Sequence, residues 1–406
     1  MKMLRKFFIF VILVLVVISF GKTKLTFWQF MMDDALAKEV LSGFSKEFPD
    51  IEVEVVQLSW STGFDKIVTA IAAGAAPDVV ELGNTWIANF ASEGVLSELH
   101  PEDLEKYRDF PGMNSTEYMG KYYGYPWLLG TRAMFYNVDL MMKAGLDPDR
   151  PPQTWSELLE AARKISELPD VYGIGLPAGE VYSPWQEWFL LAIWGNGGNV
   201  ISKDLKKATL NSQQNRDTAR FYQELSKYAL KSKQKDLGDA FGEGRVGFLV
   251  SGAWSIGTLA QSYPNLNYGV CLIPKPDKPD GIHASFLGGE ILAVPSQTKN
   301  VDAARKFINY LMRPEIAMII TKHYPGVYPA DPKASSDPWF EDNPLHLVFF
   351  EQLKTAFPVP PTPAWPKIED VLTNVVDDLI ISYKDVDEVL NFYNTEIQRI
   401  LDEVGM

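Results

Sequence analysis

Acidic and aromatic side chains are the groups in this sequence that could do chemistry. Two carboxyl groups about 5–9 Å apart can serve as the acid and base of a glycosidase. Asp33, Glu180 and Glu290 lie in segments expected to line a cleft. The same carboxylates can instead accept hydrogen bonds from sugar hydroxyls without any reaction. Because a sequence contains no distances, hydrolysis and binding both stay open on these residues alone.

Trp254 stands in the stretch SGAWSIG (251–257), among residues too small or too polar to cover an indole. A tryptophan side chain buries about 150–250 Å² when it is covered, so either distant residues or a ligand must cover this ring. A pyranose has a face of C–H groups that an indole covers well, while polar groups bond its hydroxyl rim. Trp254 is therefore a candidate for sugar contact.

Motifs for the common enzyme and metal chemistries are absent. The sequence has no H-E-x-x-H, G-x-S-x-G or P-loop motif and no G-x-G-x-x-G followed by a helix, and its only cysteine is Cys271. Tyr122 and Tyr123 are adjacent in a strand-like segment, so they point to opposite faces and cannot bind one ferric ion together. We expect no metal and no cofactor. A net charge of −14 without a basic stripe also excludes nucleic acid as a partner.

The N-terminus has the three parts of a secretory signal peptide. MKMLRK is basic, residues 7–20 are mostly apolar, and Ser19 and Gly21 are small residues at the spacing of a cleavage site after Gly21. The apolar run is too short to span a bilayer, which takes about 20 residues. No cysteine stands at the cleavage site, so we expect no lipid anchor. The predicted location is the periplasm.

Strands and helices alternate along the first hundred residues. Apolar periodicity predicts strands over 24–30, 51–56 and 79–82, with helices over 34–48 and 64–73 and a further helix reaching Ser92. This alternation is typical of a parallel α/β sheet, in which ligands bind beyond the carboxyl ends of the strands. The residues expected at those ends are Gln29, Phe30, Trp60, Asn84 and Trp86. Trp28, inside the first strand, is expected in the core.

The rest of the chain continues with mixed elements. Thr154 and Glu157 have the spacing of a capping box, and residues 284–295 indicate an extended strand interrupted by Gly288 and Gly289. Paired glycines in a strand mark the close approach of another group. Residues 302–311 and 314–323 are expected to be helical, 358–366 to be polyproline-like, and the C-terminus to hold a helical pair. Removal of the predicted signal peptide, residues 1–21 of 406, leaves a mature chain long enough for two domains.

Eight segments, taken in this order, resemble a known family. They are LTFWQF, FSKEFPDIEVEV, GAAPDVVEL, TRAMFYNVDLMMKAG, TWSELLEAARKI, FGEGRVGFLVSGAW, FLGGEILAVP and AARKFINYLMRPE. With this spacing and a signal peptide, the chain resembles a family 1 extracellular solute-binding protein of an ATP-driven sugar importer, the class that includes maltose-binding protein. The resemblance extends over essentially the whole mature chain.

The resemblance implies a two-lobed α/β periplasmic binding protein fold of type II, with a hinge of crossing strands. The chain would cross near Thr131–Tyr136, near Phe286–Gly289 and near Pro325. Residues 1–21 would be the signal peptide. Residues 22–131 and 287–325 would form the N-terminal lobe, and residues 132–286 and 326–406 the C-terminal lobe.

The resemblance also implies function: a monomer, not an enzyme, that binds a sugar between its lobes and delivers it to the permease subunits of an ABC importer. The cargo implied is an oligosaccharide. In this family a tryptophan at the GAW position stacks on the sugar, which matches Trp254. Trp127 and Leu128 replace smaller residues of relatives and suggest one more aromatic surface, whereas Trp188 and Trp194 are expected in the core. Arg132 would bond hydroxyls or pair with an acid at the hinge. The full predicted set is Gln29, Asp33, Trp60, Asn84, Trp86, Trp127, Arg132, Tyr182, Trp185, Trp254, Gly288, Gly289, Glu290 and Trp365.

Two other functions remain alternatives. One is a secreted carbohydrate-active enzyme that uses two of the cleft carboxylates, which would cleave a glycan rather than return it intact. The other is a family member with non-sugar cargo, such as a polyamine or a polyol phosphate. A polyamine would require more acids clustered around the aromatic residues. A phosphate would require basic residues or helix N-termini that the sequence does not place.

Overall fold

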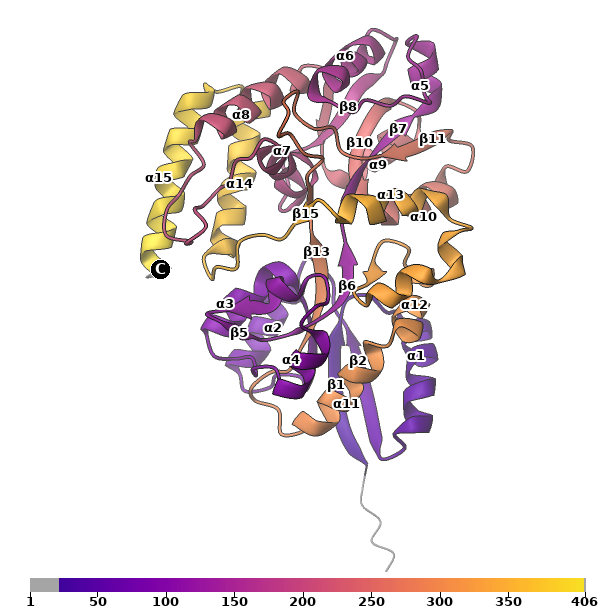
Figure 1. The fold of residues 1–406 in the computed structure, drawn as a ribbon, viewed down its shortest axis with the longest axis vertical. Helices are drawn as coiled ribbons and strands as arrows, with labels where there is room; N and C mark the ends of the chain where they lie inside the picture. Colours follow the sequence, from indigo (N-terminus) through magenta and orange to yellow (C-terminus); the bar gives the residue numbers. More distant parts are fainter. Residues whose placement is uncertain (1–21, 405–406) are drawn as a thin grey trace, which may run out of the picture.

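The computed structural model describes residues 22–404, so the predicted signal peptide lies outside the described residues. Two lobes, each a sheet with helices around it, are stacked along the long axis of the molecule (Figure 1). The first sheet has the strand order β14-β6-β13-β3-β1-β2. Its strands are β1 (Thr23–Gln29), β2 (Ile51–Gln57), β3 (Val79–Gly83), β6 (Tyr125–Gly130), β13 (Gly288–Ala293) and β14 (Tyr328–Pro329).

The second sheet has the strand order β11-β7-β10-β8-β9. Its strands are β7 (Arg132–Asn137), β8 (Tyr172–Pro177), β9 (Ala229–Ser232), β10 (Val246–Gly252) and β11 (Tyr268–Cys271). Two small pairs lie outside both sheets, namely β12 (Ser285–Phe286) with β15 (Ala356–Phe357), and β4 (Glu117–Tyr118) with β5 (Lys121–Tyr122). In the first sheet β1 is parallel to β2 and β3, as the alternation of strands and helices predicts.

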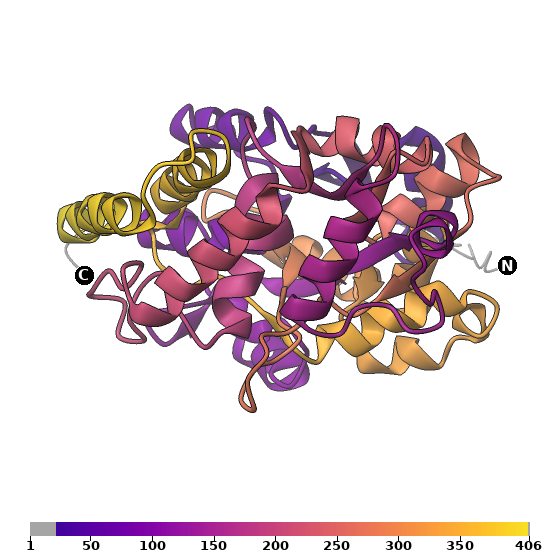
Figure 2. The same cartoon turned by 90° about the horizontal axis from the view of Figure 1, so that it is seen from above.

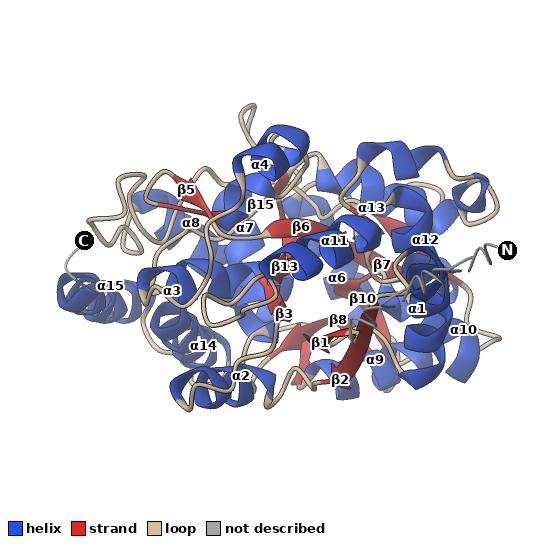
Figure 3. Ribbon diagram, turned by 90° about the horizontal axis from the view of Figure 1, so that it is seen from below, coloured by secondary structure: helices blue, strands red, loops and turns tan. Residues whose placement is uncertain are grey.

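Helices surround the strands of both lobes, as the view from below shows (Figure 3). Those that follow or flank the first sheet are α1 (Asp34–Glu47), α2 (Gly63–Ala72), α3 (Ile87–Ser92), α4 (Pro101–Tyr107), α11 (Val301–Leu311) and α12 (Pro314–His323). The others are α5 (Val138–Lys143), α6 (Trp155–Ser166), α7 (Leu190–Gly195), α8 (Gln213–Ser226), α9 (Gln234–Gly242), α10 (Trp254–Ser262), α13 (Pro344–Leu353), α14 (Trp365–Ile380) and α15 (Val386–Val404).

Local sequence signals explain where several of these elements begin. The Thr154 hydroxyl accepts from the Glu157 backbone N–H while the Glu157 carboxylate accepts from the Thr154 backbone, which is the predicted capping box of α6. Asp33 caps α1 by accepting from the Leu36 N–H at 2.9 Å. These contacts satisfy backbone donors that a helix leaves free at its N-terminus.

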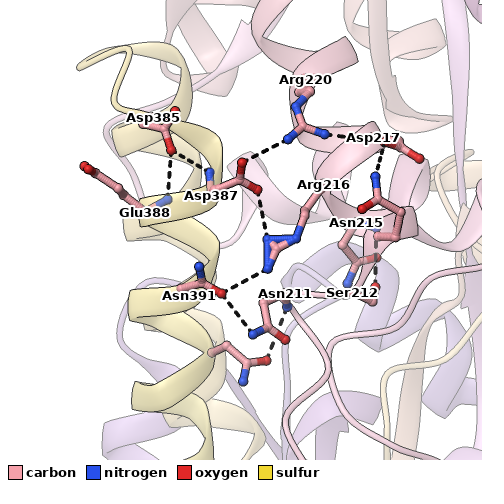
Figure 4. A network of polar contacts seen from close by, with 12 residues as sticks. Asn211, Ser212, Asn215, Arg216, Asp217, Arg220, Asp385, Asp387, Glu388 and Asn391 are labelled. Carbon is pink, nitrogen blue, oxygen red and sulfur yellow. Dashed lines mark hydrogen bonds and ion pairs between the residues drawn. The ribbon is translucent and has the colours of Figure 1, made fainter.

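The last helix is fastened to α8 by a polar network (Figure 4). Asp387 accepts from Arg216 at 2.9 Å and from Arg220 at 3.0 Å, and Asn391 accepts from Arg216 at 3.0 Å. Asp385 accepts from the backbone N–H groups of the first turn of α15. The view from above shows α14 and α15 side by side at one end of the molecule (Figure 2). The C-terminal pair is therefore held to the second lobe by charge as well as by apolar packing.

The chain passes between the sheets where the strands end. β6 of the first sheet and β7 of the second are separated only by Thr131, and β12 is separated from β13 of the first sheet only by Leu287. β14, at Tyr328–Pro329, still pairs with β6 of the first sheet, beyond the predicted limit of the N-terminal lobe at residue 325. The lobe boundaries at 131 and 287 stay predictions that agree with this sheet membership.

Candidate functional site

The candidate site lies where the second sheet meets the strands that connect the lobes. β10 ends at Gly252, opposite Arg132, the first residue of β7. β13 begins at Gly288, opposite Gly130, the last residue of β6. The residues that follow β10 therefore begin beside the connection between the two sheets. Trp254, the first residue of α10, stands at this position.

Trp254 is partly exposed, and its small neighbours are needed because the ring lies on them. A Cβ atom placed on Gly252 would be 1.8 Å from Cζ3 of the indole, so only glycine fits there. A Cβ atom on Gly326 would be 2.9 Å from Cβ of Trp254. The Arg132 guanidinium lies 4.6 Å from the centroid of the indole ring, within the range of a cation–π contact. The stretch SGAWSIG thus positions an indole against backbone and a guanidinium.

Arg132 is almost buried, with 8% of its surface exposed. Its Nη2 donates to Oε1 of Gln186 at 2.9 Å, and its Nε lies 3.9 Å from Oε1 of Glu187. Burial lowers the pKa of Arg132, and Glu187 and Glu290 oppose that shift by raising it. Of the two roles considered for Arg132, the ion pair with an acid is present in the structure. Its Nε has no hydrogen-bond partner.

Glu187 is a site residue that the sequence did not single out. Its side chain is 1% exposed, Oε1 accepts a hydrogen bond from Gln234, and Oε2 has no hydrogen-bond partner. Burial raises the pKa of Glu187 to about 7, although Arg132 lowers it. The available signal was an acid inside the aromatic and apolar run 185–194, because such an acid is rarely buried without a reason.

Glu81 and Glu290 form a hydrogen-bonded pair of carboxyl groups. β3 and β13 are antiparallel neighbours in which Glu290 faces Gly83, so Glu81 lies diagonally across on the same face. Oε2 of Glu81 also accepts from the Phe30 N–H at 2.8 Å. Burial raises the pKa of Glu81 to about 7. Burial also raises the pKa of Glu290 well above its usual value, and the negative charge of Glu81 raises it in the same direction. Two buried carboxyl groups in contact must share a proton. The sequence pointed to Glu290 but not to Glu81, whose signal was an acid within the apolar strand VVEL.

Trp60 presents the exposed ring of the first lobe. It follows β2, is 43% exposed, and stacks on Phe30 with ring centroids 4.1 Å apart and an interplanar angle of 16°. Trp86 lies behind this pair, 5.5 Å from Trp60 between centroids, and is buried. Of the two tryptophans predicted at the ends of these strands, Trp60 can offer an open face, and Trp86 supports it from within the core.

The extra aromatic surface predicted at Trp127 is wrong. Trp127 is buried to 1% exposure, and its Nε1 donates to the Leu311 carbonyl at 3.1 Å. The physical reason is that β6 lies between β13 and β14 in the first sheet, and Trp127 packs edge-on against Phe27 of β1. Trp127 is therefore a core residue of the first lobe.

Trp185 and Trp365 are also buried, which contradicts the prediction that their rings contact ligand. Each has no exposed surface, and they pack edge to face with centroids 5.9 Å apart. Trp185 packs edge-on against Phe286 in addition. Both belong to the main apolar core of the second lobe, because α14 lies over the helical turn that holds Trp185. Trp188 and Trp194 are buried there too, as predicted.

Several predicted polar residues make contacts inside the protein instead. Gln29 is fully buried, and its amide bonds the backbone N–H and carbonyl of Met32 at 2.5 and 2.6 Å, so it closes a turn and is not open to ligand. Asn84 donates from Nδ2 to the Leu287 carbonyl at 2.9 Å and so joins β3 to the connecting segment. Asp33 is exposed and serves as the cap of α1.

The paired glycines allow close packing within the protein. A Cβ atom on Gly289 would lie 3.3 Å from the carbonyl oxygen of Leu128 in β6, and one on Gly288 would lie 3.0 Å from the Phe286 ring. The group that approaches these glycines is therefore a neighbouring strand and an aromatic ring. The close approach predicted at these glycines is made by groups of the protein itself, and their contact with a ligand stays a prediction.

Tyr182 stands among acids of both lobes. Burial, together with the charges of Glu369, Asp370 and Asp65, raises its pKa to about 12. Asp65 belongs to α2 of the first lobe, whereas Glu369 and Asp370 belong to α14. Glu369 also accepts a hydrogen bond from Thr85 of the first lobe. Tyr182 has a φ of 73°, a conformation that non-glycine residues rarely adopt.

Metal ligation and membrane crossing find no support in the described part of the chain. Across residues 22–404, no group of three or more His, Cys, Asp and Glu side chains is arranged to hold a metal ion. Among the same residues, none of the helices has the length and apolar character needed to cross a membrane.

Comparison with known proteins gives one consistent result. Residues 29–318 match the family model of bacterial extracellular solute-binding proteins. A putative binding protein of Brucella abortus is 26% identical over 87% of this chain and 86% of its own length. The diacetylchitobiose binding protein DasA of Streptomyces coelicolor is 30% identical over 71% and 68%. The crystal structure of an ABC transporter solute-binding protein from Thermotoga lettingae bound with α-D-tagatose superimposes with a TM-score of 0.80, at 27% identity over 94% of this chain and 100% of that one.

Proposed function

The chain belongs to the family of bacterial extracellular solute-binding proteins, and on that premise we propose that it binds a sugar for an ATP-driven importer. The cargo is an oligosaccharide held between the two lobes. The observation that carries this proposal is Trp254, a partly exposed indole placed on Gly252 at the end of β10 and flanked by the buried guanidinium of Arg132. An aromatic face beside hydrogen-bonding groups is what a sugar ring requires. The sugars bound by DasA and by the Thermotoga lettingae protein support this ligand class.

Binding is coupled to the angle between the lobes. A sugar that contacts Trp254 on the second lobe and Trp60 on the first favours the closed arrangement over the open one. The difference in affinity between the two arrangements is the free energy that shifts the population. The permease subunits of the importer recognise the closed shape. Thr131, alone between β6 and β7, is a connection short enough to act as a hinge.

The proposed binding residues are the exposed ring faces and the polar groups that lie beside them, including the buried Arg132 and Glu187. Trp254 and Trp60 supply ring faces, and Arg132, Glu187 and Glu290 supply polar groups. Asp33 and Tyr182 remain proposed members at the edge of the site, and Asn84, Gly288 and Gly289 shape it. The proposal leaves out the residues whose ring is covered, or whose amide is bonded, within the protein: Gln29, Trp86, Trp127, Trp185 and Trp365.

The protein acts without catalysis, outside the cytoplasm, as a monomer. Its relatives are binding proteins. In glycosidases the two carboxyl groups are about 5–9 Å apart and flank the sugar bond that is cleaved. Glu81 and Glu290 are in direct contact, so no sugar fits between them. Cleavage after Gly21 would release it to the periplasm without a lipid anchor. Inorganic phosphate and polyol phosphates are poor ligands because Arg132 already pairs with Glu187.

Thermal unfolding of the protein from Lys22 onward, against mono- and oligosaccharides at millimolar concentration, tests this proposal. A ligand at a hundred times its Kd stabilises the folded state by about 2.7 kcal/mol. We expect the midpoint to rise with one class of glycan, and chromatography to recover that glycan unaltered. Absence of a shift with every sugar would overturn the proposal, and recovery of a cleaved glycan would make the protein an enzyme.

A further inference from the structure

Four charged residues form a continuous group beside Trp254, which we call the interlobe cluster: Glu81, Arg132, Glu187 and Glu290. Glu81 and Glu290 share a hydrogen bond, Glu290 lies within electrostatic range of Arg132, and Arg132 Nε lies 3.9 Å from Glu187 Oε1. The members come from β3, β7, β13 and the helical turn 185–189, so both sheets contribute. The cluster contains three carboxyl groups and one guanidinium. Its composition favours an additional positive charge.

The acid excess continues around the cluster. The Glu180 charge raises the pKa of Glu187. Two residues after Glu180 stands Tyr182, whose pKa is raised by the charges of Asp65, Glu369 and Asp370. Among the charged groups that influence Glu187, Glu290 and Tyr182 most strongly in the described chain, Arg132 is the only cation. An anionic ligand such as a uronate or a sugar phosphate would meet repulsion from several carboxylates at once.

A buried acceptor without a donor indicates what kind of ligand group is needed. Glu187 is 1% exposed, and its Oε2 accepts no hydrogen bond. An unpaired buried acceptor destabilises the folded protein, and more so when it is charged. A carboxylate can only accept, so the group that satisfies it must donate. Because Glu187 pairs with Arg132, and Arg132 lies over the Trp254 ring, this acceptor belongs to the proposed sugar site.

We propose that the bound sugar carries a protonated amino group and that the interlobe cluster recognises it. An ammonium group has three donors, which match Oε2 of Glu187 and the carboxyl of Glu290. Its charge also replaces the proton that Glu81 and Glu290 share, so the bound state keeps the same total charge. The proposal rests on the proposed function, because it names the class of sugar for that site.

Acid titration supplies a readout that a neutral sugar would not give. Glu81 and Glu187 have pKa values raised to about 7, so both are partly protonated near neutrality. The groups facing them are Glu290 for Glu81, and Arg132 with Glu180 for Glu187. A cation binds best to the ionised carboxylates, so affinity for an amino sugar should rise with pH for as long as its amine keeps its proton. Binding should release protons, which calorimetry in buffers of different ionisation enthalpy measures.

The decisive experiment compares sugars that differ only in charge. The probes are oligomers of glucosamine and of galactosamine, the same oligomers after N-acetylation, and oligomers of glucose and galactose. Thermal unfolding and titration calorimetry at low salt would measure each with the protein from Lys22 onward. We expect the free amines to bind at least tenfold more tightly than the N-acetylated and neutral forms, a difference of about 1.4 kcal/mol.

Conservative variants separate recognition of charge from a structural role. Glu187→Gln and Glu290→Gln keep size and polarity, and each should lose at least tenfold of the preference for the amine and most of the proton release. Glu351→Gln, on the exposed face of α13, is the matched control and should change neither. If either cluster variant fails to fold, loss of affinity for the amine with added salt in the unaltered protein remains a test.

The outcomes distinguish this proposal from the one it rests on. Tighter binding of neutral or N-acetylated oligomers, or an unchanged preference in Glu187→Gln and Glu290→Gln, would overturn the amino sugar and leave the sugar-binding function standing. Absence of binding by every sugar would overturn both.

Discussion

Replacing Gly252 by alanine tests whether the packing of the Trp254 ring against Gly252 creates the sugar site. The added Cβ would lie 1.8 Å from Cζ3 and 2.2 Å from Cε3 and Cη2 of the indole. Non-bonded carbon atoms need about 3.5–4.0 Å, so the ring must move by roughly 1.5–2 Å. Such a movement takes the indole from its present place 4.6 Å from the Arg132 guanidinium, a contact worth about 0.5–2 kcal/mol, and changes the face offered to ligand.

We expect Gly252→Ala to weaken binding of the identified sugar about tenfold or more, equivalent to about 1.4 kcal/mol. The variant keeps the tryptophan, so the loss would come from its position alone. Titration calorimetry gives the Kd, and circular dichroism checks that the fold is retained. Trp254→Ala provides the limit in which the ring is absent, and its loss of affinity should be at least as large.

Gly238 in α9 provides the matched control, because a Cβ atom there would meet nothing within 4 Å. Gly238→Ala should leave the Kd unchanged and stabilise the helix by up to about 1 kcal/mol. An unaltered Kd in Gly252→Ala, together with an unaltered Kd in Trp254→Ala, would refute the reasoning and remove Trp254 from the site.

Three further predictions concern the stability of the fold. Trp127→Ala should lower the free energy of unfolding by about 3–5 kcal/mol in urea titration, because it empties a core position; a loss below about 1 kcal/mol would contradict its placement. Asp387→Ala should lower the free energy of unfolding by about 1 kcal/mol or less, because the ion pairs that it breaks are half exposed. Glu396→Ala, on the same helix, is the control and should have no effect. Equal effects of the two variants would show that the network of Figure 4 does not hold α15. Burial lowers the pKa of His346 from 6.5 to about 4, so the unfolded chain binds a proton first as the pH falls, and the stability contributed above pH 6.5 should be lost between pH 6.5 and 4. His346→Gln should flatten the profile over that window, and an unchanged slope in this variant would argue against a buried neutral imidazole.

Elements with local signals were predictable to within a residue or two. The alternation of IEVEVV describes β2, which spans Ile51–Gln57, and the expected helix 314–323 coincides with α12. Thr154 and Glu157 cap α6 as their spacing indicates. In each case the contacts that determine the element lie within one helical turn or one strand, so the residues that make them are close together in the sequence.

The direction in which an aromatic ring points was predictable only in part. Trp254 and Trp60 are exposed enough to meet a ligand, whereas Trp127, Trp185 and Trp365 are buried. All five were predicted to line the site. The difference depends on which strand or helix covers each ring, and the covering element comes from a distant part of the chain. Trp127, for example, is closed off by Leu311 in α11.

The charged centre of the site depends still more on tertiary structure. Glu81 and Glu290 are far apart in the chain, and their hydrogen bond exists because β3 and β13 are neighbours in one register. Glu187 meets Arg132 only after the second sheet has formed. The sequence by itself determined the class of fold and the family, and it predicted Trp254 as a ligand contact, since periodic patterns and ordered motifs are local properties. Only the tertiary structure decided which acids share protons and which rings are open, because burial and charge pairing are set by contacts between distant segments.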